Sequence, residues 1–353
     1  MKVLMTADAV GGVWTYALEL ADALAERDVE VTLCVMGPAP DRDQCVELRA
    51  SRVTRAYVGE YALEWTQDPW DDVERAGEWL LEIAEDVQPD LLHLNGYAHA
   101  ALPWDAPVIV VGHSDVLSWH EAVRGRWAGP EWRRYSERVA DGLAAADLLV
   151  APTQVMLDEL IRLYDPGCRR LVVPNGSRRR FRPRPKSHVV LACGRVWDEA
   201  KNVEAVVRVA PRVEWTVVVC GEGDVGTGVT ALGRLGREQL DPVFAAATIF
   251  AAPARYEPFG LAALEAGRAG CALVLGDIPS LREVWGTAAL YVAPDDEDGL
   301  ERALRLLITR PDLRAEYASR ARRRAGRFTV DRMADGYLSA YHRVLRSTPV
   351  RAA

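Results

Sequence analysis

The sequence predicts an α/β protein that is divided into two domains of similar architecture. The chain has 353 residues, which exceeds a typical single α/β core and suits two domains of ordinary size. Short apolar runs alternate with amphipathic helical stretches, and this alternation occurs once before Asn175 and again after it. Strand–helix alternation implies right-handed crossovers, so each half is expected to be a mostly parallel sheet with helices on both faces, as in Rossmann-like domains.

The first half is predicted to begin with a strand at residues 3–6, from which Gly11 and Gly12 turn the chain into a helix at 13–27. The further strands and helices expected in this half are strands at 29–35, 91–94, 107–111 and 148–151, with helices at 73–85 and 131–144. We place the N-terminal domain at residues 1–174.

The same alternation resumes after a linker at 175–187, which is rich in arginine and contains two prolines. The elements expected in the second domain, 188–327, are strands at 188–193, 216–220, 248–252 and 272–275, with helices at 203–209, 237–246 and 260–267. The tail at 298–346 is predicted to be helical throughout.

The composition indicates a globular protein and argues against several function classes. Hydrophobic residues make up 49% of the chain, and the formal net charge of −8 disfavours nucleic acid as a partner. No apolar run approaches the length of a membrane span, and Asp8 interrupts the N-terminus where a signal peptide would be apolar. The six cysteines lack the spacing of a metal site, which indicates thiols in a reducing compartment. We therefore expect a soluble, cytoplasmic protein.

The strongest local pattern joins the predicted strand at 248–252 to the predicted helix at 260–267. Pro258 keeps the helix from beginning earlier, so Glu257 is expected on the loop at the end of the strand. Three main-chain amides then lie at a helix N-terminus, which is an anion-binding position: those of Phe259, Gly260 and Leu261.

A second carboxylate, Glu265, lies about one turn into this helix. There it can accept hydrogen bonds from the hydroxyl groups of a ligand, such as those of a ribose. On spacing alone, the alternative is that Glu257 and Glu265 are simply solvated charges.

Two cations follow the predicted strand at 188–193. Arg195 and Lys201 flank a loop in which Gly194 allows a close backbone approach. Two cations that face a helix N-terminus suit a diphosphate, whose negative charge grows as it leaves. The alternative is a surface salt bridge of Arg195 or Lys201 with Asp198 or Glu199.

Two weaker signals lie in the N-terminal half. Gly11 and Gly12 occupy the first strand–helix turn but form only part of a dinucleotide-binding fingerprint, so a tight turn without a ligand is the alternative. His113 follows the strand at 107–111, at the edge where ligands bind, and a hydrogen-bonded structural histidine is the alternative there.

Together these segments resemble the GT-B family of nucleotide-sugar glycosyltransferases of group 1, or family 4. The resemblance covers nearly the whole chain, and Glu257 and Glu265, in order after the Arg195/Lys201 segment, are its most specific feature. The segments that carry it are 11–13, 146–153, 173–176, 194–195 with 201–202, 256–265 and 276–283.

The resemblance implies that the two domains face each other across a cleft. The N-terminal domain would bind the acceptor, the second domain would bind the donor, and a final segment, 328–353, would cross back to the N-terminal domain. The implied reaction is a retaining transfer of a sugar from a nucleotide-sugar donor to a hydroxyl acceptor, a saccharide or small-molecule glycoside. No cofactor and no essential metal are implied.

The resemblance also implies a role for each candidate residue. His113 and Glu257 would be the catalytic residues beside the donor sugar, Arg195 and Lys201 would clamp the diphosphate, and Glu265 would bind the ribose. The other substrate-binding candidates would contact the phosphates, the sugar or the base: Gly11, Gly12, Glu222, Leu235, Phe259, Gly260 and Leu261.

Two other classes fit the same architecture. A non-hydrolysing nucleotide-sugar epimerase would change the sugar without transferring it, and a non-catalytic protein would only bind the nucleotide sugar. The paired cations and the paired glutamates favour transfer.

Two features depart from the family's usual pattern. The linker continues after Gly176 with three arginines at 178–180 and is more basic than usual. The N-terminal half carries several aromatic side chains, for which stacking on a sugar acceptor and packing in the core are both open interpretations: Tyr61, Trp65, Trp70, Trp119, Trp127 and Trp132. Arginines beside Trp127 leave peripheral membrane association open, although the interleaved Glu131 and Glu137 favour a solvated face. The sequence does not determine the nucleotide base of the donor, the sugar that is transferred, the acceptor or the oligomeric state.

Overall fold

The computed structural model describes residues 1–347, which form two compact units. The first unit contains Met1–Glu121, Gly125–Gly176 and the described residues from Val330 onward, and the second contains Ser177–Thr329 with the short piece Ala122–Arg124. The sequence-based boundaries at 174 and 188 lie on either side of the change of unit at Gly176. The predicted final segment 328–353 extends further than the described residues, because 348–353 lie outside them.

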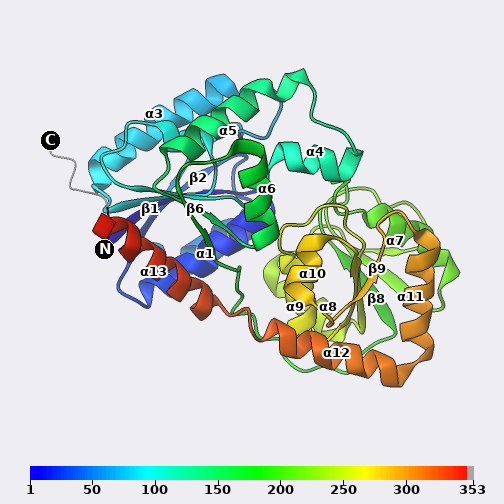
Figure 1. Ribbon diagram of the computed structural model, residues 1–353. Helices are drawn as coiled ribbons and strands as arrows, with labels where there is room; N and C mark the ends of the chain where they lie inside the picture. Colours follow the sequence, from blue (N-terminus) through cyan, green and yellow to red (C-terminus); the bar gives the residue numbers. More distant parts are fainter. Residues whose placement is uncertain (348–353) are drawn as a thin grey trace. The chain divides into compact units, whose positions relative to one another are not determined.

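Within the described residues, the first unit has a seven-stranded parallel sheet with the order β3-β2-β1-β4-β5-β6-β7 (Figure 1). Its strands are β1 (Lys2–Asp8), β2 (Glu30–Met36), β3 (Arg55–Val58), β4 (Leu91–Leu94), β5 (Val108–Val111), β6 (Leu148–Ala151) and β7 (Arg169–Val172). Its helices are α1 (Gly12–Ala25), α2 (Arg42–Ala50), α3 (Trp70–Val87), α4 (Val116–Arg124), α5 (Arg133–Ala145), α6 (Gln154–Tyr164) and α13 (Val330–Ser347), with short 3₁₀ turns at η1 (Ala98–Ala101) and η2 (Pro130–Trp132).

The C-terminal helix α13 completes the core of the first unit. Its apolar side chains recur at the spacing of one helix face, and Val330, Met333, Tyr337 and Tyr341 are all buried. They pack against α1, which contributes the fully buried Leu20 to the same core. The first unit therefore joins the two ends of the described chain.

Residues 177–329, all of which are described, contain a six-stranded parallel sheet with the order β10-β9-β8-β11-β12-β13. Its strands are β8 (Val189–Cys193), β9 (Thr216–Cys220), β10 (Thr230–Ala231), β11 (Ile249–Ala252), β12 (Ala272–Gly276) and β13 (Leu290–Val292). Its helices are α7 (Val203–Val209), α8 (Arg237–Ala246), α9 (Leu261–Ala269), α10 (Pro279–Trp285), α11 (Glu297–Thr309) and α12 (Pro311–Ala325), with a 3₁₀ turn at η3 (Ala210–Arg212). Numbered from its own first strand, this sheet has the order 3-2-1-4-5-6, which is also the order of the first six strands in the first unit, where β7 is added at the edge. Both units are therefore Rossmann-like.

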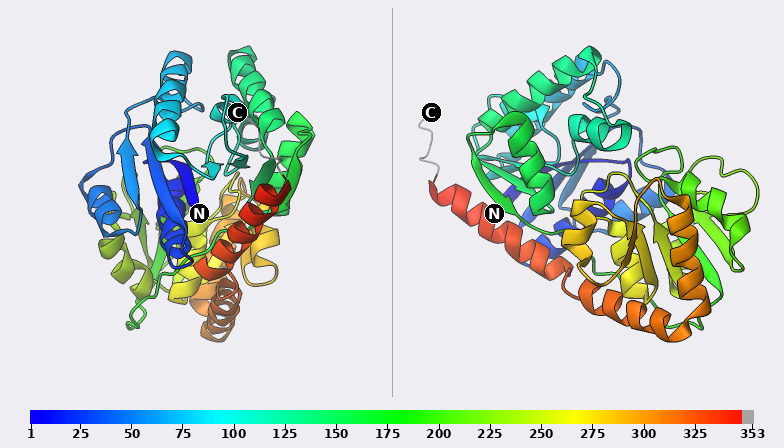
Figure 2. Two further views of the ribbon diagram at one scale, coloured as in Figure 1. Left: turned by 90° about the vertical axis from the view of Figure 1, so that its left-hand side faces the viewer. Right: turned by 45° about the vertical axis from the view of Figure 1, so that its right-hand side comes forward.

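The tail at 298–346 is almost entirely helical, as predicted, and consists of three separate helices. The structure divides this tail into α11, α12 and α13, and the turn between α11 and α12 is sharp (Figure 2). Pro311 is the first residue of α12, a position that suits proline because no helical hydrogen bond is lost there. Gly326 follows the last residue of α12 and has a right-handed φ of −62°. In the part of the chain that the structure describes, no helix is long and apolar enough to cross a bilayer.

Candidate active site

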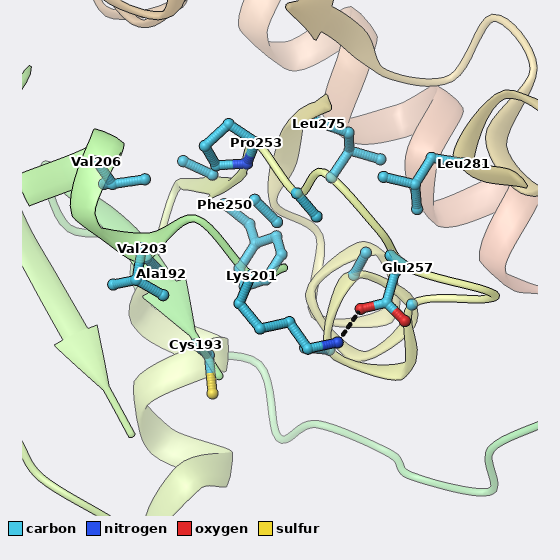
Figure 3. Close-up of a pocket in the computed structure, with 16 residues that line it drawn as sticks. Ala192, Cys193, Lys201, Val203, Val206, Phe250, Pro253, Glu257, Leu275 and Leu281 are labelled. Atoms are coloured by element: carbon cyan, nitrogen blue, oxygen red, sulfur yellow. Dashed lines mark hydrogen bonds and ion pairs between the residues drawn. The ribbon is translucent and has the colours of Figure 1, made fainter. Parts of the chain in front are cut away.

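The second unit contains a pocket at the carboxyl ends of its central strands (Figure 3). The wall includes Cys193 at the end of β8, Ala252 at the end of β11 and Leu275 near the end of β12. Doubly wound sheets bind ligands at this edge, because the loops that leave the strands gather there. Most of the wall is apolar, and its charged groups are Lys201 and Glu257.

Lys201 and Glu257 form an ion pair in this pocket. The Nζ atom of Lys201 is 2.7 Å from Oε2 of Glu257, and the two side chains are 24% and 21% exposed. The residues come from separate loops, which meet because β8 and β11 are neighbours in the sheet. Asn202 fixes the first loop: its Nδ2 donates to the carbonyls of Pro253, at 2.9 Å, and of Pro294, at 2.7 Å. The ion pair with Glu257 and the fixed loop together hold the ammonium of Lys201 at the pocket.

Helix α9 begins beside this ion pair. Gly260 precedes its first residue with a left-handed φ of +91°, and a Cβ there would lie 3.3 Å from Cδ2 of Leu281. Glycine suits this position on both counts. The Oγ of Ser280 donates to the carbonyl of Glu257 at 2.7 Å, which ties the loop to the start of α10. The positive end of α9 and the ammonium of Lys201 therefore belong to the same pocket.

The neighbouring residues Phe259 and Leu261 differ in exposure. Phe259 is buried, and its ring packs edge-on against Phe328, so only its main chain is available to a ligand. Leu261 is half-buried and packs against the core of the unit. For both residues, the geometry leaves the main-chain amide as the group that a phosphate could use.

Arg195 makes the local ion pair that was the alternative interpretation of its segment. Its Nη2 lies 2.7 Å from Oδ2 of Asp198, and its guanidinium lies 5.3 Å from the centre of the Trp197 ring. Burial alone would raise the pKa of Asp198, but Arg195 and Lys201 lower it overall. Arg195 is not among the residues that line the pocket. Arg195 and Lys201, which the sequence placed in one clamp, thus pair with different carboxylates, Asp198 and Glu257.

Glu265 also has a charged partner that the sequence analysis missed. Its Oε2 lies 2.6 Å from Nη1 of Arg179, and the two side chains are 13% and 6% exposed. Arg179 belongs to the segment that the sequence predicted to be a linker. The sequence feature that sets Arg179 apart is the run of three arginines at 178–180, and this run does not indicate that one of them is buried.

The two candidates for contact with the base lie on separate loops, Glu222 after β9 and Leu235 after β10. Glu222 is exposed, and its carbonyl accepts from the main-chain amide of Val196 at 3.0 Å. Leu235 is half-buried against the core of the unit. Gly221 lies so close to Gly194 that a Cβ on it would be 1.8 Å from the Gly194 carbonyl oxygen. Glycine at 221 therefore allows the loops after β8 and β9 to pack together.

His113, the candidate catalytic residue of the first unit, belongs to a neutral hydrogen-bonded group. Nε2 of His113 lies 2.8 Å from Oδ1 of Asn95, and the ring packs edge-on against Tyr16 at 4.5 Å between centroids. Asn95 donates from Nδ2 to the carbonyl of Thr6 at 2.6 Å, which fixes Oδ1 toward the imidazole. Nε2 of His113 must then carry the hydrogen. Burial lowers the pKa of His113 to about 3, so the ring is neutral.

Gly11 and Gly12 lie at the start of α1, as the sequence predicts. Gly11 has a left-handed φ of 75°, and both residues are exposed. The structure brings Lys201, Glu257 and Gly260 together in one pocket. His113, Gly11 and Gly12 belong to the first unit. Among residues 1–347, no three His, Cys, Asp or Glu side chains gather in a group that could hold a metal ion.

Two protein-family models match this chain in succession. Residues 10–177 match the model of Glycosyltransferase Family 4, and residues 187–310 match the model of Glycosyl transferases group 1. Together with the two Rossmann-like units, these matches define the class: the chain belongs to the GT-B glycosyltransferases of group 1, family 4.

Named relatives and solved structures support this membership. A glycogen synthase of Mycobacterium tuberculosis is 27% identical, over 92% of this chain and 90% of the relative. A D-inositol 3-phosphate glycosyltransferase of Saccharomonospora viridis is 28% identical, over 96% of this chain and 90% of the relative. Among solved structures, sucrose-phosphate synthase of Thermosynechococcus elongatus has a TM-score of 0.82 at 18% identity, covering 99% of this chain and all of the other. HepE of Anabaena, solved with UDP-glucose, has a TM-score of 0.76 at 18% identity over the same shares.

Proposed function

We propose that this glycosyltransferase moves a sugar from a nucleotide-sugar donor to a hydroxyl acceptor and retains the anomeric configuration. The observation that carries the proposal is the ion pair of Lys201 and Glu257 beside the start of α9. A cation and a helix N-terminus at the same pocket form a preorganised positive field, which is what a leaving diphosphate requires. The structural similarity to HepE of Anabaena, solved in complex with UDP and with UDP-glucose, supports a nucleotide-sugar donor.

In this proposal Lys201 stabilises the charge that develops on the diphosphate as the glycosidic bond to it breaks. Glu257 holds the ammonium in place before the donor arrives and then orients the hydroxyls of the donor sugar. The amides of Phe259, Gly260 and Leu261 contact the distal phosphate, and Glu265 accepts from the ribose. The neutral His113 offers a hydrogen-bond acceptor to the donor sugar without adding charge.

The acceptor belongs to the same proposal as a hydroxyl of a saccharide or small-molecule glycoside. Relatives named as a glycogen synthase and as inositol phosphate glycosyltransferases support this class of acceptor. We also propose a cytoplasmic location, which the six free cysteines of the described chain support.

The test is a thermal-shift screen against UDP-, GDP- and ADP-sugars, followed by turnover with the donor that binds. A bound donor raises the melting temperature by mass action. NMR of the product's anomeric centre then determines the stereochemistry. Inversion at that centre would reject the retaining mechanism, and a screen without any nucleotide-sugar response would reject the donor class.

A further inference from the structure

Arg179 is the most deeply buried arginine that contacts a candidate substrate-binding residue, and nothing in the proposed function uses it. It lies in the first residues of the second unit, within the stretch that the sequence predicts as a linker. Its side chain is only 6% exposed, so its charge depends on partners rather than on water. A buried guanidinium with defined partners restricts the orientation of the carboxylates that it pairs with.

The partners of Arg179 come from two helices. On α9, Nη1 lies 2.6 Å from Oε2 of Glu265. On α8, Nε donates to Oδ1 of Asp241 at 2.9 Å, and Nη2 donates to the carbonyl of Arg237 at 2.9 Å. Burial alone would lower the pKa of Arg179, but Glu265 and Asp241 raise it overall. The several N–H donors of the planar guanidinium therefore connect α8 and α9.

The main chain and the aromatic surroundings of Arg179 hold it in this position. Its amide donates to Oγ of Ser177 at 3.1 Å, and its carbonyl accepts from Nε of Arg268 at 3.0 Å. Its guanidinium lies over the rings of Phe181 and Phe244, at 5.3 and 5.9 Å from their centres. Arg268 and Glu265 are three residues apart on α9, so one face of this helix contacts both the main chain and the side chain of Arg179.

We propose that Arg179 is a positioning residue, which holds Glu265 in the orientation that recognises the ribose of the donor. This inference rests on the proposed function, in which Glu265 binds the ribose hydroxyls. A carboxylate that accepts from two hydroxyls must stay ionised and keep one rotamer, and a nearly buried carboxylate does neither without a cation. Arg179 supplies that cation from a segment outside the pocket.

The proposal is tested by comparing ribose and deoxyribose ligands. UDP, GDP and ADP are titrated into the full-length protein, each beside its 2′-deoxy and 3′-deoxy counterparts. In the wild type, the ribonucleotide that binds should do so about tenfold or more tighter than its deoxy counterparts, the value of one hydrogen bond to a charged group. Arg179→Gln should bring this ratio close to one by weakening the ribonucleotide alone. Arg180→Gln, at the exposed neighbouring position, is the matched control and should keep the wild-type ratio.

Two further variants keep the test decisive if Arg179→Gln does not fold. Glu265→Gln should lose the same ratio while Arg179 stays in place. Arg179→Lys keeps the charge but lacks the fork that reaches both helices, so its ratio should fall below the wild-type value. Melting temperatures without ligand identify the variants that fold.

The outcomes separate this inference from the proposed function. A wild-type ratio that persists in folded Arg179→Gln or Arg179→Lys overturns the positioning role while the nucleotide donor stands. A wild type that binds ribo- and deoxyribonucleotides equally also overturns it. A wild type that binds no nucleotide in any of the three series would instead refute the proposed function.

Discussion

The two units use different physical means to hold their candidate residues, although the first six strands of their sheets share one order. In the second unit the candidates are held by ion pairs, Lys201 with Glu257 and Arg179 with Glu265. In the first unit the candidate is held by neutral groups, since His113 bonds to Asn95 and carries no charge. A charged site can bind and release a charged ligand as its ion pairs rearrange. A neutral site keeps its geometry across pH, and the predictions below test this difference.

The neutral group in the first unit extends from His113 into the core. Tyr16 packs on His113, and its hydroxyl lies 3.1 Å from Nε2 of His93. Nδ1 of His93 lies 2.6 Å from the hydroxyl of Tyr341 on α13. Burial lowers the pKa of His93 to about 3 as well. Two uncharged hydrogen bonds and the ring contact of Tyr16 with His113 thereby connect the C-terminal helix to the candidate histidine.

The largest effect is expected at Lys201. Lys201→Ala should lower kcat/KM by about 10²–10³-fold, the loss that follows removal of one preorganised charge-stabilising donor. Arg195→Ala should cost less, because its guanidinium is already paired with Asp198 and lies outside the wall of the pocket. Steady-state kinetics with the donor identified by screening measures both variants. Equal losses in the two variants would show that Arg195 leaves Asp198 and takes an equal part in binding the diphosphate during catalysis.

The next effect concerns the partner of this cation. Glu257→Ala should lower turnover by about 10²-fold, because both the ammonium of Lys201 and the donor sugar lose their orientation. Glu257→Gln should retain more activity, since the amide keeps one acceptor oxygen and the shape. Single-turnover measurements separate this loss from weaker donor binding. If the Gln and Ala variants are equally and fully inactive, the charge itself is essential.

The central strands of both sheets were predictable from the sequence, whereas the edge strands were not. Continuous apolar runs predicted β1, β2, β4, β5 and β6 of the first unit and β8, β9, β11 and β12 of the second. The strands that the sequence analysis missed are β3, β7, β10 and β13, the four edges of the two sheets. A central strand is covered on both faces and must be apolar, but an edge strand is short and partly exposed. The residues Arg169 and Arg170 of β7 show why no such run appears there.

The residues of the candidate site also divide into those that the sequence predicts and those that it does not. Glu257, Lys201 and Gly260 follow predictable central strands, and their meeting in one pocket follows from adjacent strand ends. Arg179 could not be placed from the sequence, because its burial depends on the packing of α8 and α9 around it. Asn95 was missed for a similar reason: its role comes from a hydrogen bond to Thr6 on a neighbouring strand.

A smaller effect, on stability, tests the neutral site. Folded His113 has a pKa of about 3, below the unfolded value of 6.5, so only the unfolded chain takes up a proton between these values. The free energy of unfolding should therefore fall as the pH is lowered through this window, by about 1.4 kcal/mol per pH unit for this residue. Urea unfolding at pH 6 and pH 5 should show a shallower dependence in His113→Gln than in the wild type. His342→Gln, at an exposed position, is the control and should keep the wild-type slope.

The smallest expected effect is that of removing divalent ions. The proposed mechanism assigns the stabilisation of the leaving diphosphate to Lys201 and the N-terminus of α9, a positive field that belongs to the protein itself. Exhaustive chelation should therefore leave kcat/KM of the wild type within experimental error. The same treatment should leave the residual rate of Lys201→Ala unchanged, which shows that no ion compensates for the missing ammonium. An absolute requirement that only an added divalent ion restores would contradict the proposal, because the charge of the diphosphate would then be neutralised by a metal rather than by the ion-paired lysine.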